Sequence, residues 1–230
     1  MISSCGNIVF FGGAGVSTES GIPDFRSAEG LFRQQYPYPP ETILSRDFFD
    51  ARTRDFFDFY REKMIYLDAR PGKAHIKLAE LEKSGRLKTV ITQNIDGLHQ
   101  KAGSKNVLEL HGSVHRNICR ECLKVYDAAY IFKSKGIPVC ICGGQIKPDV
   151  VLYGEPLDSP VCETAMRYIE KADMLIVGGT SLAVYPAAGF ISCYRGNKLI
   201  LINKTPTPYD HAASHIINDS IGEVLEDIVV

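Results

Sequence analysis

Short apolar runs recur along the chain, and glycine or polar residues follow each of them before a helical pattern begins. The runs are Ile8–Phe11, Lys88–Thr92, Val107–Leu110, Met174–Val177 and Leu199–Ile202. Strands that alternate with helices are typical of a parallel sheet, because parallel strands need crossover connections. The pattern therefore predicts an α/β fold, a Rossmann-like parallel sheet with helices on both faces.

The residues that follow these runs are small or polar. They are Gly12–Gly15, Gln93–Asp96, His111–Gly112, Gly178–Ser181 and Asn203. In open sheets of this class, ligands bind beyond the carboxyl ends of the strands. Loops are generally polar, which alone would explain part of this composition. Small or polar residues after all of these predicted strands together favour one shared binding crevice.

Two stretches interrupt the alternation. In the first, five of the 11 phenylalanines lie between Phe48 and Phe59, and Phe56, Tyr60 and Met64 share one helix face. This predicts an inserted helical module over about residues 27–72 with its own core, which can also line an apolar substrate channel. A second helix, around Ala74, Leu78 and Leu81, leads back to the sheet. The second interruption is an inserted cysteine-bearing module over about residues 114–150, within a single domain of residues 1–230.

Composition narrows the class of protein. The chain has 230 residues, 45% of them hydrophobic and 23% charged, as expected of an ordinary globular protein. Its 26 basic and 27 acidic residues leave a net charge of −1, which argues against nucleic-acid binding through bulk charge. No apolar run is long enough to span a membrane. The short run at Ile8 lacks the preceding basic residues that a signal peptide has. We therefore expect a cytoplasmic protein whose seven cysteines are not a disulfide framework.

The glycine turn after the first run is ambiguous by itself. Glycines allow the backbone to approach a pyrophosphate closely, and a helix start beyond them offers free N–H groups. The strict dinucleotide fingerprint is absent, because Thr18 stands where a third glycine belongs and no ribose-binding acid follows on a second strand. A nicotinamide-dependent dehydrogenase is therefore disfavoured, while a plain tight turn and a nucleotide loop both stay open.

The continuation of this turn carries a more specific signal. Residues 13–27 read GAGVSTESGIPDFRS, which is similar to the GAGxSxxSGIPDFR signature of the sirtuins, the NAD-dependent protein deacylases. Further segments resemble the same family in the expected order. They are Thr92–His99, Leu110–Ser113, Lys147–Glu155, and Gly179–Leu182 with Tyr185–Pro186. The resemblance runs from about residue 7 to the end of the chain.

The resemblance implies a reaction and a set of site residues. In sirtuins the acyl-lysine oxygen attacks C1′ of the NAD ribose, nicotinamide leaves, and a histidine acts as general base toward the ribose hydroxyls. Water then releases the products, deacylated lysine and O-acyl-ADP-ribose. By motif match the catalytic residues are His111 and Asn94. The expected NAD contacts are Gly13, Ala14, Gly15, Thr18, Phe25, Arg26, Gln93, Asn94, Ile95, Asp96, His111, Gly179, Thr180, Ser181 and Asn203. For Thr180 and Asn203 a purely turn-forming role stays open.

The substrate side follows from the same resemblance. The stretch from Val150 to Tyr153 resembles the segment on which sirtuins pair with the acyl peptide through the main chain, so Val151, Tyr153 and Gly154 are the expected substrate-binding residues. Sirtuins that remove succinyl groups carry a Tyr-x-x-Arg pair, whereas Tyr60 here is followed by Lys63. We therefore expect acetyl groups to be preferred over succinyl groups, on acylated lysine peptides or proteins.

Four cysteines cluster in the second interruption. Cys119 and Cys122 precede Cys140 and Cys142, which resembles a closed four-thiolate site for one structural Zn²⁺. The second pair is one residue shorter than the usual Cys-x-x-Cys. The interpretation that competes with zinc binding is a set of reduced cysteines without a metal.

Two other functions compete with deacylation. A mono-ADP-ribosyltransferase would share the fold, but the complete segment around Val151 favours deacylation. A zinc-ribbon module that recruits nucleic acid or protein belongs to a different class, and it would leave His111 and the glycine turn unexplained.

Overall fold

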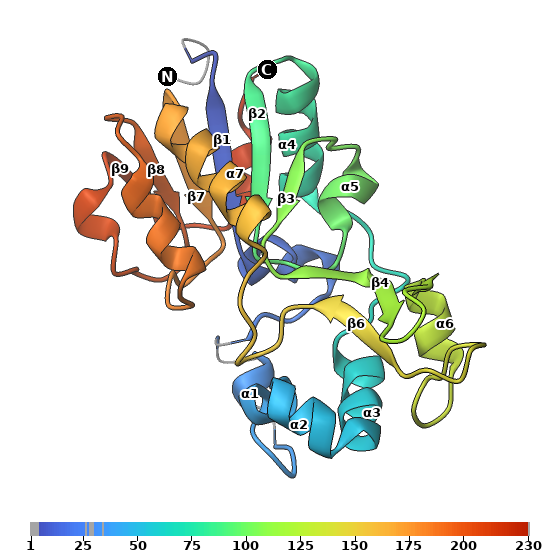
Figure 1. The fold of residues 1–230 in the computed structure, drawn as a ribbon. Coiled ribbons are helices and arrows are strands. Elements are labelled where there is room, and N and C mark those ends of the chain that lie inside the picture. Colours follow the sequence, from blue (N-terminus) through green and yellow to red (C-terminus); the bar gives the residue numbers. More distant parts are fainter. Residues whose placement is uncertain (1–4, 26, 28–29, 34, 230) are drawn as a thin grey trace.

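A six-stranded parallel sheet forms the centre of the computed structural model, which describes residues 5–25, 27, 30–33 and 35–229 (Figure 1). The strand order is β3-β2-β1-β7-β8-β9. The strands are β1 (Ile8–Gly12), β2 (Leu87–Thr92), β3 (Val107–Glu109), β7 (Met174–Gly178), β8 (Leu199–Ile202) and β9 (His215–Ile217). This confirms the predicted α/β class, and every predicted apolar run is a strand of this sheet.

Helices cover both faces of the sheet, so its central strands are apolar on both sides. All residues of β1 and β7 are buried, as expected of parallel strands between two helical layers. Val9 and Phe11 pack with Ile169 of α7 (Ser159–Lys171) on one face. Ile8 and Phe10 pack with residues of α4 (Lys73–Lys83) and α8 (Ile221–Glu226) on the other face.

The strand order reverses between β1 and β7. The chain moves outward from β1 to β2 and β3 on one side, and from β7 to β8 and β9 on the other. A topological switch point of this kind opens a crevice beyond the carboxyl ends of the two central strands. The segments after Gly12 and after Gly178 therefore flank the place where a ligand is expected.

A smaller body lies beyond the carboxyl ends of the central strands (Figure 1). It contains an antiparallel sheet in the order β5-β4-β6 and several helices. Its elements are α1 (Pro40–Ile43), α2 (Arg46–Ala51), α3 (Thr53–Lys63), β4 (Gly112–Cys119), β5 (Val125–Tyr126), α6 (Ala128–Lys133) and β6 (Ile146–Val150). The helix α5 (Leu98–Ala102) follows β2 on the large sheet.

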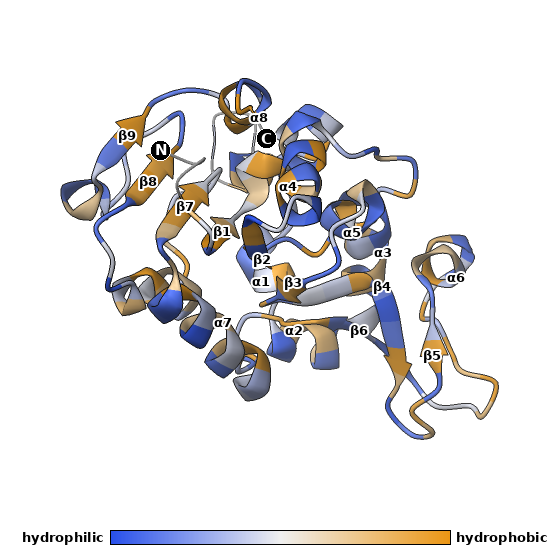
Figure 2. Ribbon diagram, turned by 90° about the horizontal axis from the view of Figure 1, so that it is seen from above, coloured by the Kyte–Doolittle hydropathy of each residue, from blue (hydrophilic) through white to orange (hydrophobic). Residues whose placement is uncertain are grey.

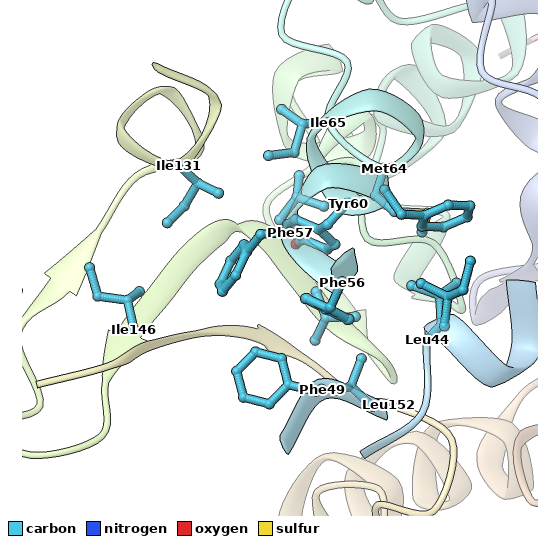
Figure 3. Close-up of a cluster of buried hydrophobic side chains, with 14 of the residues drawn as sticks. Leu44, Phe49, Phe56, Phe57, Tyr60, Met64, Ile65, Ile131, Ile146 and Leu152 are labelled. Carbon is cyan, nitrogen blue, oxygen red and sulfur yellow. The ribbon is translucent and has the colours of Figure 1, made fainter. Parts of the chain in front are cut away.

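The two interruptions of the sheet share one hydrophobic core. Phe49, Phe56, Phe57 and Tyr60 of α2 and α3 belong to the same buried cluster as Ile131 of α6 and Ile146 of β6 (Figure 3). Ring pairs fix the packing, with Phe49 edge-on to Phe56 at 4.9 Å between ring centres and Phe56 stacked on Tyr60 at 5.4 Å. The helix face predicted from Phe56, Tyr60 and Met64 is thus the face that α3 buries.

The strands β4, β6 and β9 do not stand out as apolar runs in the sequence. β4 and β6 are interrupted by polar or charged residues, and all three residues of β9 are exposed. Figure 2 shows the contrast between β4, which contains hydrophilic segments, and β7, which is largely hydrophobic. Of the helices in the part of the chain that the structure describes, none has the length and apolar character needed to cross a bilayer.

Candidate active site

A pocket of about 440 Å³ lies at the switch point, between the sheet edge and the smaller body. Almost all of the sequence-predicted NAD and substrate residues line it. From that set the lining residues are Gly13, Ala14, Gly15, Phe25, Gln93, Asn94, Ile95, Asp96, His111, Gly179, Thr180, Ser181, Asn203, Val151, Tyr153 and Gly154. Residues spread over most of the chain are therefore brought together around one cavity.

Two predicted NAD residues are not part of this lining. Thr18 is exposed just outside the pocket, and its hydroxyl donates a hydrogen bond to the Gly15 carbonyl at 3.1 Å. Its position shapes the glycine turn rather than the cavity wall. Arg26 lies outside the residues that the structure describes.

The floor of the pocket is formed by backbone that packs against backbone. The Gly15 N–H donates to the Gly179 carbonyl at 2.8 Å, and a Cβ on Gly15 would lie 2.8 Å from the Gly179 Cα. A Cβ on Gly179, whose φ is +60°, would lie 2.5 Å from the Val16 nitrogen. The segments after β1 and β7 can approach this closely only because both positions are glycine.

His111 is oriented by a backbone hydrogen bond. It follows β3, and its Nδ1 lies 2.8 Å from the carbonyl oxygen of Gln93. Since a carbonyl can only accept, Nδ1 carries the proton, which leaves the lone pair on Nε2. Burial lowers the pKa of His111, and the hydrogen bond to Gln93 raises it by a smaller amount. The ring is therefore a neutral base at neutral pH.

A buried polar network lies beside His111. Ser17 donates to Asp96 Oδ2 at 2.7 Å and accepts from the side-chain amide of Asn94 at 3.0 Å. Asn94 also donates to the Gly13 carbonyl at 3.1 Å, and Asp96 accepts from the Leu98 N–H at 2.9 Å. These bonds hold Asn94 and Asp96 in single orientations on the pocket wall.

The network continues into the protein through two histidines. His75 Nδ1 accepts from the Gly72 N–H at 3.1 Å, so its Nε2 carries the proton and faces Ser17 Oγ at 3.4 Å. His99 lies 4.7 Å away between ring centres and is 1% exposed. Desolvation lowers the pKa of both rings, so both are neutral.

Ser17 lines the pocket and is not among the site residues expected from the sequence. It is the first serine of the GAGxSxxSGIPDFR pattern, so the motif contains a signal for it. The helical module also lines the pocket, as the channel interpretation of its sequence expects, through Leu44, Met64 and Tyr66. Its core is not its own as predicted, because it is shared with the cysteine-bearing module.

The segment expected to bind substrate is partly paired already. The Val151 N–H donates to the His111 carbonyl at 3.0 Å. Tyr153 is paired on both sides, because its N–H donates to Leu44 and its carbonyl accepts from Arg46, each at 2.9 Å. Toward other described residues, the Val151 carbonyl and the Gly154 N–H make no hydrogen bond, and both residues line the pocket.

The four clustered cysteines lie together at the end of the small sheet. Their sulfur atoms all lie within 4.8 Å of one another, and two pairs, Cys119–Cys142 and Cys122–Cys140, are 3.5 Å apart. Sulfurs around a tetrahedral Zn²⁺ with bonds of about 2.3 Å are spaced by about 3.8 Å, so the four thiols fit this ion. The Tyr126 hydroxyl donates to Cys140 Sγ at 3.0 Å and fixes its position. The short Cys140–Cys142 spacing is compatible with four converging ligands.

Comparisons with known proteins agree with this geometry. The profile of the Sir2 family matches residues 13–186. The chain is 61% identical to an NAD-dependent protein deacetylase of Clostridium tetani, over 100% of this chain and 94% of that protein. A solved structure of Sir2 with a deacetylated p53 peptide and 3′-O-acetyl ADP ribose superposes with a TM-score of 0.90 at 37% identity, covering 97% of this chain and 92% of that one.

A second solved structure, of Sir2 with p53 peptide and NAD⁺, superposes with a TM-score of 0.86 at 38% identity, over 97% of this chain and 92% of that one. The match therefore includes the sheet, the pocket and the cysteine-bearing module together. By its sequence, its fold and the arrangement of its pocket, the chain belongs to the Sir2 family.

Proposed function

We propose that this chain is an NAD-dependent protein-lysine deacetylase. It consumes NAD, water and an acetyl-lysine side chain and produces free lysine, nicotinamide and O-acetyl-ADP-ribose. The observation that carries this function is His111, a neutral base in the wall of the pocket where the segments after β1, β2, β3 and β7 meet. The relatives and the complexes with acetyl ADP ribose support the same reaction.

His111 is the proposed general base. Its Nε2 is the only ring nitrogen left free by the Gln93 hydrogen bond, so this atom takes the proton from a ribose hydroxyl. The lowered pKa keeps the ring unprotonated at neutral pH, so the base is ready before substrate arrives. Burial also excludes water that would hydrolyse a reactive intermediate.

We assign the remaining NAD contacts by their place around the pocket. Asn94 and Asp96 are held by Ser17 and lie at the nicotinamide end, where carboxylate and amide groups can bind a carboxamide. Gly13, Ala14 and Gly15 lie against the phosphates, and Phe25 covers the ribose. Thr180, Ser181 and Asn203 lie on the adenosine side; here the Asn203 amide also donates to the Thr205 carbonyl at 2.7 Å, so it shapes its own turn.

The acyl-lysine peptide binds along residues 151–154 in this proposal. The free Val151 carbonyl and Gly154 N–H offer one acceptor and one donor to an extended chain, which gives affinity with little demand on sequence. Among the described residues, Lys63 is the one lysine or arginine in the pocket wall. Because Tyr60 is fully buried in the aromatic core and a lysine stands in place of the arginine of the Tyr-x-x-Arg pair, we infer that acetyl groups are preferred over succinyl groups.

Two further proposals concern the whole chain. It is one catalytic domain, with a helical module of about residues 27–72 and a zinc-binding module of about residues 114–150 inserted into the sheet. Its location is cytoplasmic, since all seven cysteines are free and four of them converge as thiol ligands rather than disulfides. The zinc is structural, because four protein ligands close a tetrahedral site.

The deciding experiment is incubation with an acetyl-lysine peptide, with and without NAD, followed by mass spectrometry of peptide and nucleotide products. We expect deacetylation only with NAD, with one nicotinamide and one O-acetyl-ADP-ribose per lysine. His111→Ala abolishes turnover, whereas His215→Ala, a histidine exposed on β9, leaves it unchanged. Deacetylation without NAD would refute the proposal, and a peptide carrying ADP-ribose would favour the transferase.

A further inference from the structure

The turn Thr18–Ser20 connects two stretches that line the pocket. Residues 13–15 and Ser17 precede it, and residues 22–25 follow it, all of them in the pocket wall. None of the turn's three residues is buried, so apolar packing does not hold it in place. Its local hydrogen bonds, such as that from the Gly21 N–H to the Thr18 carbonyl, fix its shape but not its position.

Glu19 ties this turn to a distant part of the chain. The Ser220 hydroxyl donates to Glu19 Oε1 at 2.5 Å, across 201 residues of sequence. Among the described residues, this is the one side-chain hydrogen bond from the turn to a segment far away in the sequence. Ser220 is the residue before α8, so the turn is attached to the start of the C-terminal helix.

The start of α8 is shaped to receive the Glu19 carboxylate. Gly222 is the second residue of α8, and a Cβ at this position would overlap both carboxylate oxygens of Glu19. The carboxylate therefore lies directly over the Gly222 backbone, in the first turn of the helix.

α8 itself is firmly attached to the main sheet. Ile221 is 4% exposed and Leu225 is fully buried, and both pack in the cluster that contains Phe10. Lys73 of α4 pairs with Glu223 at 2.8 Å and with Glu226 at 2.7 Å. Figure 2 shows α8 beside α4 on this side of the molecule. The helix is therefore held in place relative to β1. Through its hydrogen bond with Ser220, Glu19 holds the turn in place relative to this helix.

We propose that Glu19, held by Ser220 and Gly222, is a positioning residue for the NAD pocket, which makes α8 part of the cofactor-binding apparatus. The inference rests on the proposed function, since it takes the pocket beside Ser17 to be the NAD site. A turn that is already in place costs no ordering free energy when NAD binds. Loss of the tether therefore weakens NAD binding more than it slows the chemical step or weakens peptide binding.

The test compares steady-state kinetics of Glu19→Ala and Gly222→Ala with those of the unaltered chain. Each variant should raise KM for NAD roughly three- to tenfold, the effect of losing one hydrogen bond of ~1 kcal/mol, and change KM for peptide and kcat less than twofold. Gly222→Ala keeps Glu19 and improves helix propensity, so its Tm does not fall. It therefore separates the tether from the stability of α8.

Two further variants sharpen the result. Lys73→Ala removes two exposed ion pairs between α4 and α8 but leaves Ile221 and Leu225 packed on the sheet and the tether in place, so KM for NAD stays unchanged. Ser220→Ala raises KM for NAD as Glu19→Ala does, and the double variant is no worse than either, because both remove one interaction. If Glu19→Ala does not fold, Glu19→Asp, whose carboxylate is one methylene short of Ser220, replaces it.

Two outcomes would overturn the inference. One is an unchanged KM for NAD in Glu19→Ala and Gly222→Ala while NAD-dependent deacetylation persists, which leaves the proposed function intact. The other is an equal rise of KM for NAD and for peptide with a lowered Tm, which would assign Glu19 a general structural role. Failure of the unaltered chain to consume NAD would instead refute the proposed function.

Discussion

The direction of the His111 pKa shift determines how activity depends on pH. In the proposed reaction the neutral ring is the base, and burial moves its pKa below the ordinary value of about 6.5. The neutral form therefore predominates above this lowered pKa and is lost as pH falls through it. We expect the acid limb of kcat/KM, measured from pH 5 to 8, to have its midpoint below about 6.5. A midpoint above that value would contradict the assignment.

The Tyr60 hydroxyl is a buried polar group without a hydrogen-bond partner among the described residues. The Tyr60 side chain is fully buried in the aromatic cluster of α3. Burial raises the pKa of this hydroxyl, so it stays protonated. An unpaired buried hydroxyl costs about 1–3 kcal/mol, so Tyr60→Phe should raise the free energy of unfolding by about 1 kcal/mol in urea denaturation.

The matched control for this prediction is Phe56→Leu, which keeps the site apolar but removes ring packing against Tyr60 at 5.4 Å. This variant should lower the free energy of unfolding by about 1 kcal/mol. A loss of stability in Tyr60→Phe would show that the hydroxyl has a bound partner, such as an internal water molecule.

At the scale of elements, β4 and β6 are held at one end by the cysteine site. β4 ends at Cys119, and β6 begins shortly after Cys142, so the four thiols lie at the end of the small sheet where Cys119 pairs with Ile146. Cys119→Ser should abolish binding of the single Zn²⁺ and lower Tm, because a structural zinc contributes directly to folding. Metal analysis and thermal unfolding measure both effects.

Cys193→Ser is the control for this prediction, since Cys193 is free and lies far from the cluster in sequence. It should retain zinc and unfold at the temperature of the unaltered chain. Folded and active protein without zinc would contradict a structural metal site.

The elements also show where sequence interpretation succeeds and where it fails. β1 and β7 are continuous apolar runs because both of their faces are covered, so their pattern is visible locally. β9 has only exposed residues, and its place in the sheet depends on pairing with β8. The role of Ser17 and the tether at Glu19 likewise depend on partners 79 and 201 residues away. The local hydrophobic pattern carries no information about contacts between residues so far apart in sequence. The match to the family motifs located the pocket residues although these contacts were not known.

At the scale of the whole molecule, the two insertions into the sheet act as one body in packing. Phe57 of α3 and Ile131 of α6 belong to one core, although β2 and β3 of the large sheet lie between them in sequence. Polar contacts join the same parts: Arg61 donates to the Gly136 carbonyl at 2.6 Å, and Arg120 pairs with Asp50 at 3.0 Å. A change that loosens the cysteine-bearing module should therefore reach the helical module and the pocket wall that it supplies.

Hydrogen exchange after removal of zinc tests this coupling. With a chelator, we expect amides of α3 to lose protection together with those of α6 and β4, because the shared core opens as one cooperative unit. Amides of β1 and β7, buried in the separate clusters of the large sheet, stay protected. Protection returns when Zn²⁺ is restored. If exchange increases only between residues 119 and 145 while α3 is unaffected, the two insertions are energetically independent, and zinc then influences the pocket only through β4 and β6.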